Sequence, residues 1–465
     1  MFLRGGRRFV ALGVLLALVL LVGFANDASR NTAKGYIDQY LENPPWRTDA
    51  RRKGNPQPKY LEEPEWVPPP IQDPFPSLTA GHDPPPIPAW NVPEPDLYKK
   101  YGLDYAPPLF IGFTRTWPIL LQAVVSYITA GWPAEHIYVV ENTGVQWANA
   151  QGKLTLQNPF YLGHAQLKKL GVNIIQAPVL MNFAQLQNYY THLAHERKWP
   201  YYFWSHMDVL AISYEDGMEG VTPRAGEPGY KSLYELCLST LNATASSDER
   251  WADKFFAYDH LTLVNRRAYD EVGGWDTFIP YYMTDCDMHS RLLMEGWTQT
   301  DARAGIVTDV NTALQDLGAL YRDKSIEPAF SDPNPPPPTP EELKAQKERE
   351  AAAAKKNQER GAEEQHHKRD VNEEELAYWR KLRDVSDHMF HYKHGERGRN
   401  TWQLGQHGGA DEPFYYSSRG IAEAIDVLTE AGREVYRRKW GHRDCDLITG
   451  AGLKLKDQWR VKPDW

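Results

Sequence analysis

The stretch Tyr201-Tyr202-Phe203-Trp204-Ser205-His206-Met207-Asp208 is an apolar run that leads directly into a histidine and an aspartate. It predicts a buried strand over Tyr201–Ser205, with His206 and Asp208 at its carboxyl end. A carboxylate placed there, with a second metal-capable side chain two residues earlier, can hold Mn²⁺ or Mg²⁺ against a diphosphate. The alternative is an aspartate that caps a loop and a histidine that makes a local hydrogen bond. These residues alone favour neither the metal site nor the purely structural interpretation.

The residues before this stretch alternate between two patterns. Short apolar runs predict strands at Leu109–Phe113, Ile137–Val140 and Val172–Ile175. Helical spacing of apolar residues predicts helices at Ile119–Tyr127 and Phe183–His195. Strands that alternate with helices indicate an α/β fold, a mostly parallel sheet with helices on both faces. Ligands of such sheets bind at the carboxyl ends of the strands, so the residues that follow each strand are the candidates for a site.

Two other strand ends carry polar residues. Thr114 and Arg115 follow the first strand, where hydroxyls and backbone N–H groups at a helix start can hold the base or phosphate of a nucleotide. A helix cap by Thr114 is the alternative. Glu141 and Asn142 follow the second strand, where a carboxylate can accept hydrogen bonds from a base or ribose. A simple turn that ends in glycine has the same sequence pattern.

A third group of residues lies within the segment 273–287, which reads GGWDTFIPYYMTDCD. Asp285 and Asp287 open a predicted helix, whose positive N-terminal end favours their charge. A carboxylate fixed there beside an aromatic wall can deprotonate an acceptor hydroxyl. The alternative is a pair of acids that only stabilises the helix.

The order of these three sites resembles the GT-A glycosyltransferases, most closely the inverting family 2 type. Ile137–Thr143 is similar to the family's nucleotide-binding strand end, and His206 to Asp208 occupies the position of its Asp-x-Asp metal motif. Val272–Asp276 is similar to the family's glycine turn, and Thr284–Asp287 to its catalytic helix start. The resemblance covers Leu109 to Trp297 and implies a GT-A, Rossmann-like fold.

The resemblance also implies roles for single residues. Asp285 takes the position of the general base, and Asp287 would hold the loop or bind acceptor hydroxyls. The aromatic residues Trp275, Tyr281 and Tyr282 are the candidates for acceptor binding. Two positions depart from the family pattern, because His206 replaces the first aspartate of the metal motif and Thr284 replaces the glutamate before the base.

The C-terminal region adds one more element of the resemblance. Residues 436–441, YRRKWG, are similar to a Lys-Trp-Gly segment of some relatives, which also carry a metal-binding histidine downstream of the base. The candidates for that histidine are His388, His391 and His394, of which His391 is preferred. A surface cluster of histidines that binds nothing is the alternative.

Composition limits the function, but cysteine usage does not settle the compartment. A net charge of -9 argues against a general nucleic-acid binder, which needs a basic face. Three cysteines allow at most one disulfide and a leftover thiol, and their spacing fits no zinc pattern.

The N-terminus predicts the location. Basic residues precede an apolar run over 9–25 that just reaches the length needed to cross a bilayer. This pattern indicates a single-pass type II membrane anchor with a lumenal body, in the Golgi or the ER. A cleavable signal peptide is the alternative, and Asn242-Ala243-Thr244 supplies a glycosylation acceptor in either case.

The expected organisation follows from these segments. It comprises a cytosolic tail at 1–8, an anchor at 9–25, a Pro-rich stem at 26–106, a GT-A catalytic domain at 107–325, a Pro-rich and charged linker at 326–376, and a C-terminal extension at 377–465 that packs on the catalytic domain.

The expected reaction is transfer of a sugar from a nucleoside-diphosphate sugar to a hydroxyl of a glycan, glycoprotein or glycolipid. It would be inverting and dependent on Mn²⁺ or Mg²⁺. A non-catalytic glycan-binding protein of the same fold is one alternative, and a nucleotidyltransferase is the other.

Overall fold

The computed structural model describes residues 57–62, 69–331, 371–395, 411–413 and 417–463, together with the single residues 31, 34, 38 and 408. The chain divides into two units, 1–65 and 66–465, and the following description concerns the second. The predicted tail and anchor, and most of the predicted linker, lie outside the described residues. In the part of the chain that is described, no helix is both long and apolar enough to span a bilayer.

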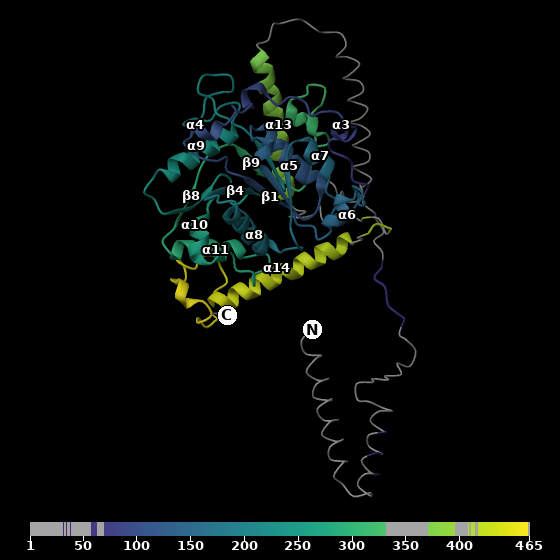
Figure 1. Ribbon diagram of the computed structural model, residues 1–465, viewed down its shortest axis with the longest axis vertical. Helices are drawn as coiled ribbons and strands as arrows, with labels where there is room; N and C mark the ends of the chain where they lie inside the picture. Colours follow the sequence, from purple (N-terminus) through teal and green to yellow (C-terminus); the bar gives the residue numbers. More distant parts are fainter. Residues whose placement is uncertain are drawn as a thin grey trace. The chain divides into compact units, whose positions relative to one another are not determined.

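A seven-stranded sheet forms the centre of the body, in the order β3-β2-β1-β4-β7-β6-β8 (Figure 1). Only β7 is antiparallel to its two neighbours, so the other six strands run in one direction. The predicted α/β class with a mostly parallel sheet is confirmed. The strands are β1 Leu109–Phe113, β2 Ile137–Glu141, β3 Asn173–Gln176, β4 Tyr201–Ser205, β6 Trp251–Phe255, β7 Leu261–Asn265 and β8 Thr298–Asp301.

Helices flank this sheet because successive side chains of its strands point to opposite faces. On one face Phe110 and Trp204 join a core with α8, α10 and α11. On the other face Leu109 and Phe203 join a core with α5 and α9. The larger helices are α5 Trp117–Thr129, α8 Phe183–Glu196, α9 Leu233–Ala245, α10 Arg266–Val272 and α11 Thr284–Met294, and the shorter ones include α6 Gln146–Ala150 and α7 His164–Lys169.

A second, two-stranded sheet lies at the carboxyl end of β4. It pairs β5 Val209–Ile212 with β9 Ile306–Asp309 in antiparallel register, with Val209 opposite Asp309. The backbone N–H of Val310 donates to the carbonyl of Asp208 at 2.9 Å. This pairing, which the sequence patterns did not predict, places Asp309 next to Asp208.

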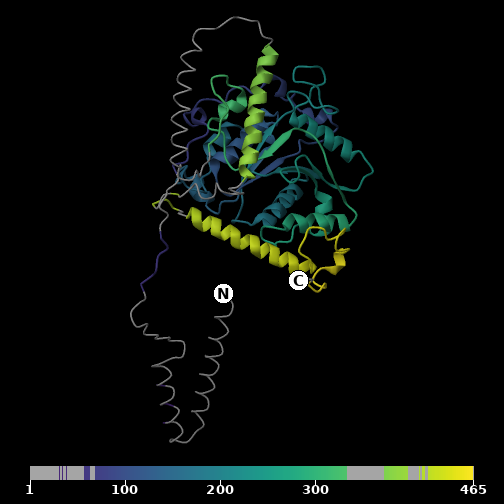
Figure 2. The same ribbon diagram turned by 180° about the vertical axis from the view of Figure 1, so that it is seen from behind.

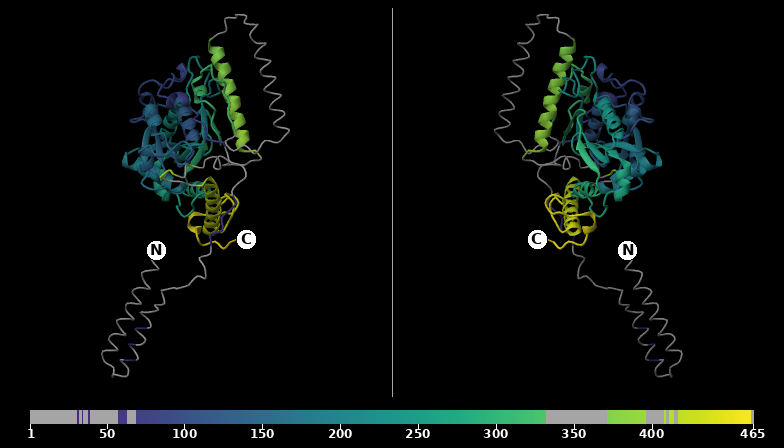
Figure 3. Two further views of the ribbon diagram at one scale, coloured as in Figure 1. Left: turned by 90° about the vertical axis from the view of Figure 1, so that its right-hand side faces the viewer. Right: turned by 90° about the vertical axis from the view of Figure 1, so that its left-hand side faces the viewer.

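Two long helices complete the body. Helix α13, Val371–Lys393, packs on β9, and Trp379 Nε1 donates to the Ser213 carbonyl at 3.1 Å. Helix α14, Ser418–Trp440, crosses the lower edge of the body beneath α8 and α11 (Figures 1 and 2). Figure 3 shows α13 in light green along one side of the body and α14 in yellow at its lower end, viewed nearly along the helix axis. A disulfide between Cys286 and Cys445 ties the chain after α14 to α11.

The stem predicted at 26–106 ends earlier than expected. Residues from about 69 onward pack on the body, where Phe75, Leu78 and Leu97 are buried in its core. The backbone N–H of Ile71 also donates to Gln157 Oε1 at 2.8 Å. These apolar residues stand too far apart to form a periodic pattern, and the elements that carry them are only four residues long or irregular. The pattern therefore did not show their burial.

Candidate active site

A cavity lies at the carboxyl ends of β1 and β4, where the order of the strands reverses. On one side of β1 the sheet continues with β2 and β3, and on the other side it continues with β4 and the remaining strands. Such a reversal opens a crevice at the strand ends, which is the usual place for a nucleotide in an open parallel sheet. The cavity has a volume of about 450 Å³. Its polar lining residues are Thr114, Arg115, Asn142, Asn182, Gln187, Ser205, His206, Asp208 and Tyr281.

Asn142 fixes one wall of this cavity. Its amide donates to the Met181 carbonyl at 2.9 Å and accepts from the Met181 N–H at 2.7 Å, and it also contacts Thr114 Oγ1 at 3.3 Å. Thr114 and Asn142 are therefore brought together, as expected for a nucleotide site. Residues Ile421, Ala424, Ile425 and Leu428 of α14 form an apolar wall of the same cavity.

Glu141, by contrast, is fully buried beneath the cavity and does not line it. Its carboxylate accepts hydrogen bonds from His164 at 2.9 Å, Asn149 at 2.9 Å and Gln176 at 3.1 Å. Burial opposes the charge of Glu141, but these hydrogen bonds outweigh burial and leave its pKa lowered. Glu141 therefore holds the end of β2 in place, and the structure does not bring it to the expected position against a ligand.

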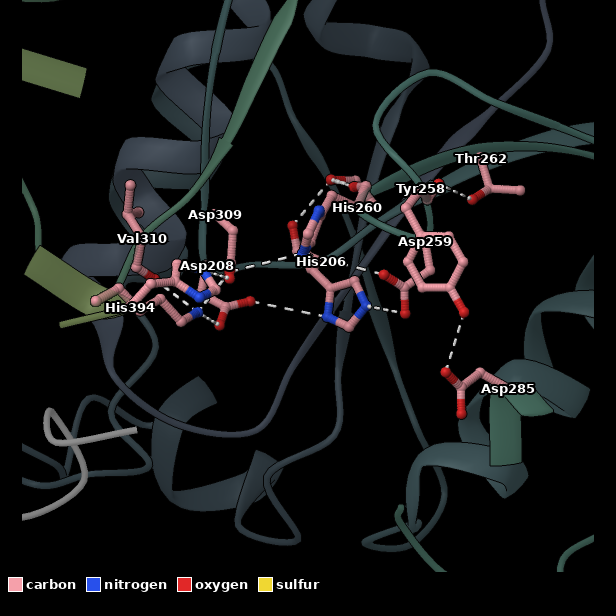
Figure 4. A network of polar contacts seen from close by, with 12 residues as sticks. His206, Asp208, Tyr258, Asp259, His260, Thr262, Asp285, Asp309, Val310 and His394 are labelled. Carbon is pink, nitrogen blue, oxygen red and sulfur yellow. Dashed lines mark hydrogen bonds and ion pairs between the residues drawn. The ribbon is translucent and has the colours of Figure 1, made fainter. Parts of the chain in front are cut away.

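His206 and Asp208 lie together at the end of β4. His206 Nδ1 is 3.8 Å from Asp208 Oδ1, and its Nε2 is 3.6 Å from Asp259 Oδ2 (Figure 4). The Phe183 ring stacks on His206, with centroids 5.9 Å apart. Burial lowers the pKa of His206, but the carboxylates of Asp259 and Asp208 outweigh burial and raise it to about 9. His206 thus brings positive charge to the position where the family motif has an aspartate.

Lys393 of α13 connects Asp208 to Asp309. Its ammonium donates to Asp208 Oδ2 at 2.7 Å, to Asp309 Oδ1 and to the Val310 carbonyl at 3.1 Å. His394 contacts the other oxygen of Asp309 at 2.9 Å. His394 was one of the three histidines considered as a metal ligand, whereas Lys393, the residue before it, was not a candidate.

His391 does not reach this group. It is exposed on α13, where its ring packs against the neighbouring Phe390. The expected metal site of Asp208, His206 and His391 is therefore not assembled, and the ammonium of Lys393 lies where a cation would bind Asp208. Within the described ranges, the one convergent group of three or more possible protein ligands is His442, Asp444 and Asp446, in the turn after α14.

Asp285 lies at the far end of the same polar network. Tyr258 donates its hydroxyl to Asp285 Oδ2 at 3.1 Å, and the next residue, Asp259, contacts His206 (Figure 4). Tyr258 has a φ of 45°, a left-handed backbone that residues other than glycine rarely adopt. Ser205 Oγ donates to the carbonyl of His260 at 2.8 Å, which ties this loop to β4. The loop of residues 258–260 thus links Asp285 to the end of β4 that borders the cavity, since Tyr258 contacts Asp285 and Asp259 contacts His206.

Asp287, two residues further on, is fully buried. Its carboxylate contacts Arg291 Nε at 2.8 Å and Lys439 Nζ at 2.6 Å, and it accepts from Trp440 Nε1 at 2.9 Å. Lys439 also contacts Asp276 Oδ2 at 2.7 Å. Lys439 and Trp440 of the Lys-Trp-Gly segment therefore fix the start of α11 through their contacts with Asp287. Of the two acids proposed for catalysis, only Asp285 is partly exposed.

The three aromatic residues proposed for acceptor binding lie in different surroundings. Trp275 is buried and packs edge-on against Phe183, with centroids 5.5 Å apart. Tyr282 packs against α14, where Arg433 lies 5.2 Å from its ring centroid. Tyr281 lines the cavity. Among these candidates, Tyr281 is therefore the one that the structure brings to the site.

A buried acid beneath α11 predicts a pH dependence of stability. Tyr269 donates to Asp253 Oδ1 at 2.8 Å, while His289 Nδ1 lies 3.9 Å from Oδ2. Burial raises the pKa of Asp253 from 3.8 to about 7, although the bond from Tyr269 opposes this. A raised pKa favours the neutral folded form, so stability falls as pH rises from about 4 to about 7.

We therefore expect Asp253→Asn to remove this part of the pH dependence. The difference in unfolding free energy between wild type and variant should change by a few kcal/mol, roughly, across that pH range. Melting temperatures of both proteins measured from pH 4 to pH 8 test it, and parallel curves would contradict it.

Comparison with known proteins does not assign the chain to a family. No protein-family model and no curated protein matches the sequence. The structure resembles a mannosyltransferase from Pyrobaculum calidifontis, PcManGT, in complex with GDP-Man and Mn²⁺, with 11% identity and a TM-score of 0.27 over 44% of this chain. It spans 60% of that protein, less than two thirds of its length.

It also resembles a cytidylyltransferase from Leptospira borgpetersenii, with 9% identity and a TM-score of 0.25 over 42% of this chain and 75% of that one.

Proposed function

We propose that this chain transfers a sugar from a nucleoside-diphosphate sugar to a hydroxyl group of a glycan, glycoprotein or glycolipid, with inversion at the anomeric carbon. The observation that carries the proposal is the pairing of two features. A cavity lies where the order of the strands reverses, and His206 lines it. The carboxylate of Asp285 lies at the other end of the polar network that begins at His206. The first suits a nucleotide and the second suits a base.

Asp285 is the residue that would take the proton of the acceptor hydroxyl. It lies in the first turn of α11, whose N-terminal end favours a negative carboxylate. The hydroxyl of Tyr258 holds one of its oxygens, which leaves the other for the acceptor. The activated oxygen then attacks the anomeric carbon from the face opposite the leaving nucleoside diphosphate.

The cavity suits a nucleotide because it combines polar groups with an apolar wall. Thr114, Arg115 and Asn142 can bind the phosphates, the ribose or the base, and the apolar side chains of α14 close the opposite side. Tyr281 lines the cavity three residues before the start of α11, where it can contact the transferred sugar or the acceptor.

We also propose that the body is lumenal, anchored in the Golgi or ER membrane through residues 9–25. Asn242 of the glycosylation acceptor is exposed on α9, as an attached glycan requires. Protease added to intact microsomes should leave the body undigested. Digestion of the whole body would overturn this location.

The activity is tested by incubating the full chain with a panel of nucleotide sugars and measuring release of the nucleoside diphosphate. We expect hydrolysis of at least one donor. Binding of glycans without hydrolysis of any donor would favour the non-catalytic alternative. Release of pyrophosphate from a nucleoside triphosphate and a sugar phosphate would favour the nucleotidyltransferase.

A further inference from the structure

The ammonium of Lys393 lies in a place that has the ligands of a cation site. The three oxygens around it, from Asp208, Asp309 and the Val310 carbonyl, are of the kind that hard divalent cations prefer. An ammonium has three N–H donors, so each oxygen receives one of them. The Lys393 side chain is only 3% exposed, so this contact is a built part of the fold.

We propose that Lys393 replaces the divalent metal of the donor site, so that the protein binds its nucleotide and works without Mn²⁺ or Mg²⁺. The inference rests on the proposed function for the identity of the ligand, whereas the cation site itself is defined by the three oxygens alone. Arg115, which lines the cavity, then supplies a charge that faces the diphosphate.

Several contacts keep Lys393 in this position. It is the last residue of α13, and that helix is fixed to the neighbouring strands by the bond from Trp379 to the Ser213 carbonyl and by a contact of 2.7 Å between Ser386 Oγ and Thr308 Oγ1. Asp309 is fixed by the pairing of β9 with β5. A buried lysine paired with two carboxylates is costly to displace, because each carboxylate would lose its nearest cation.

The first test is binding of Mn²⁺ alone to the full chain, measured by loss of the free-ion EPR signal and by the melting temperature. Wild type should show no Mn²⁺ binding that depends on Asp208. Lys393→Met, which removes the charge but keeps much of the volume, should bind Mn²⁺ between Asp208 and Asp309, and Mn²⁺ should raise its melting temperature by several degrees, roughly, through linkage.

Two control variants make this result specific. Lys381→Met removes an exposed lysine of the same helix, which pairs with Glu327, and should behave as wild type. Lys393→Met/Asp309→Asn removes one of the two carboxylates that lose their lysine, so it should fold even where the single variant does not, and it should bind Mn²⁺ much more weakly. Binding that persists in this double variant comes from elsewhere, such as the group at His442.

The second test is donor hydrolysis in excess chelator. Equal rates with chelator and with Mn²⁺ are expected for wild type. Mn²⁺ binding by wild type that is lost in the Asp208→Asn variant would overturn the inference. Activity of wild type only in the presence of Mn²⁺ would overturn it too, as would a folded Lys393→Met variant that binds no Mn²⁺. A protein that hydrolyses no donor under any condition would instead count against the proposed function, because the Mn²⁺ binding results would still decide the role of Lys393.

Discussion

Asp285→Asn is expected to lower kcat by about a hundred- to ten-thousand-fold, the usual contribution of a positioned base. Asparagine has nearly the same shape as aspartate and can still accept the hydrogen bond from Tyr258, but its amide cannot take the acceptor's proton. Asp285 does not line the cavity, so affinity for the nucleotide should change little. Single-turnover rates with the active donor, together with calorimetric nucleotide binding, measure the two effects separately.

A matched control distinguishes loss of the base from loss of charge near the site. Asp270 is an acid on the neighbouring helix α10 that pairs with Arg266 at 3.4 Å, and Asp270→Asn should keep near-normal turnover. Tyr258→Phe removes only the hydroxyl that holds Asp285, so it should lower kcat by about tenfold, less than loss of the base itself. Normal turnover in Asp285→Asn would require the inverting mechanism with this base to be abandoned.

The sequence predicted those parts of the fold that short segments encode. Leu109–Phe113 and Tyr201–Ser205 form strands with the predicted bounds, because each is an uninterrupted apolar run that is buried on both faces. The three candidate sites were found because they directly follow such strands or open the helix α11, so the same short segments marked their positions. The pairing of β5 with β9 was missed, since it joins segments almost a hundred residues apart. β5 is a short apolar run, but nothing in it indicates β9 as its partner.

Lys393 was missed for a different reason, although a signal for it exists. The buried residues Trp379, Leu382, Ser386, Met389 and Lys393 repeat at intervals of three and four along α13. Such spacing marks the face of a helix that packs on the body. A lysine that continues an apolar stripe predicts a buried ion pair, whereas His391 falls on another side of the helix. The helical phase would therefore have favoured Lys393, but not identified Asp208 and Asp309 as its partners.

Asp287→Ala is expected to destabilise the protein by about 3–5 kcal/mol, because it leaves two buried cations without their shared partner. Arg291 and Lys439 are both nearly fully buried, and Trp440 also loses the acceptor for its indole N–H. Lys439 keeps Asp276, and Arg291 keeps the carbonyls of Val272 and Gly274, so part of the network survives. In a domain of this size the melting temperature should fall by roughly 6–20 °C.

The same measurement on Asp285→Ala gives the contrast that separates the two acids. Asp285 is only half-buried and makes one hydrogen bond to a tyrosine, so its loss should change stability by no more than about 0.5 kcal/mol. Lys439→Met combined with Asp287→Asn removes one cation along with the carboxylate, so this pair should be less destabilised than the two single effects predict when added. If Asp287→Ala melted like wild type but lost turnover, Asp287 would be a group that acts on the substrate, and the buried network around it would need another account.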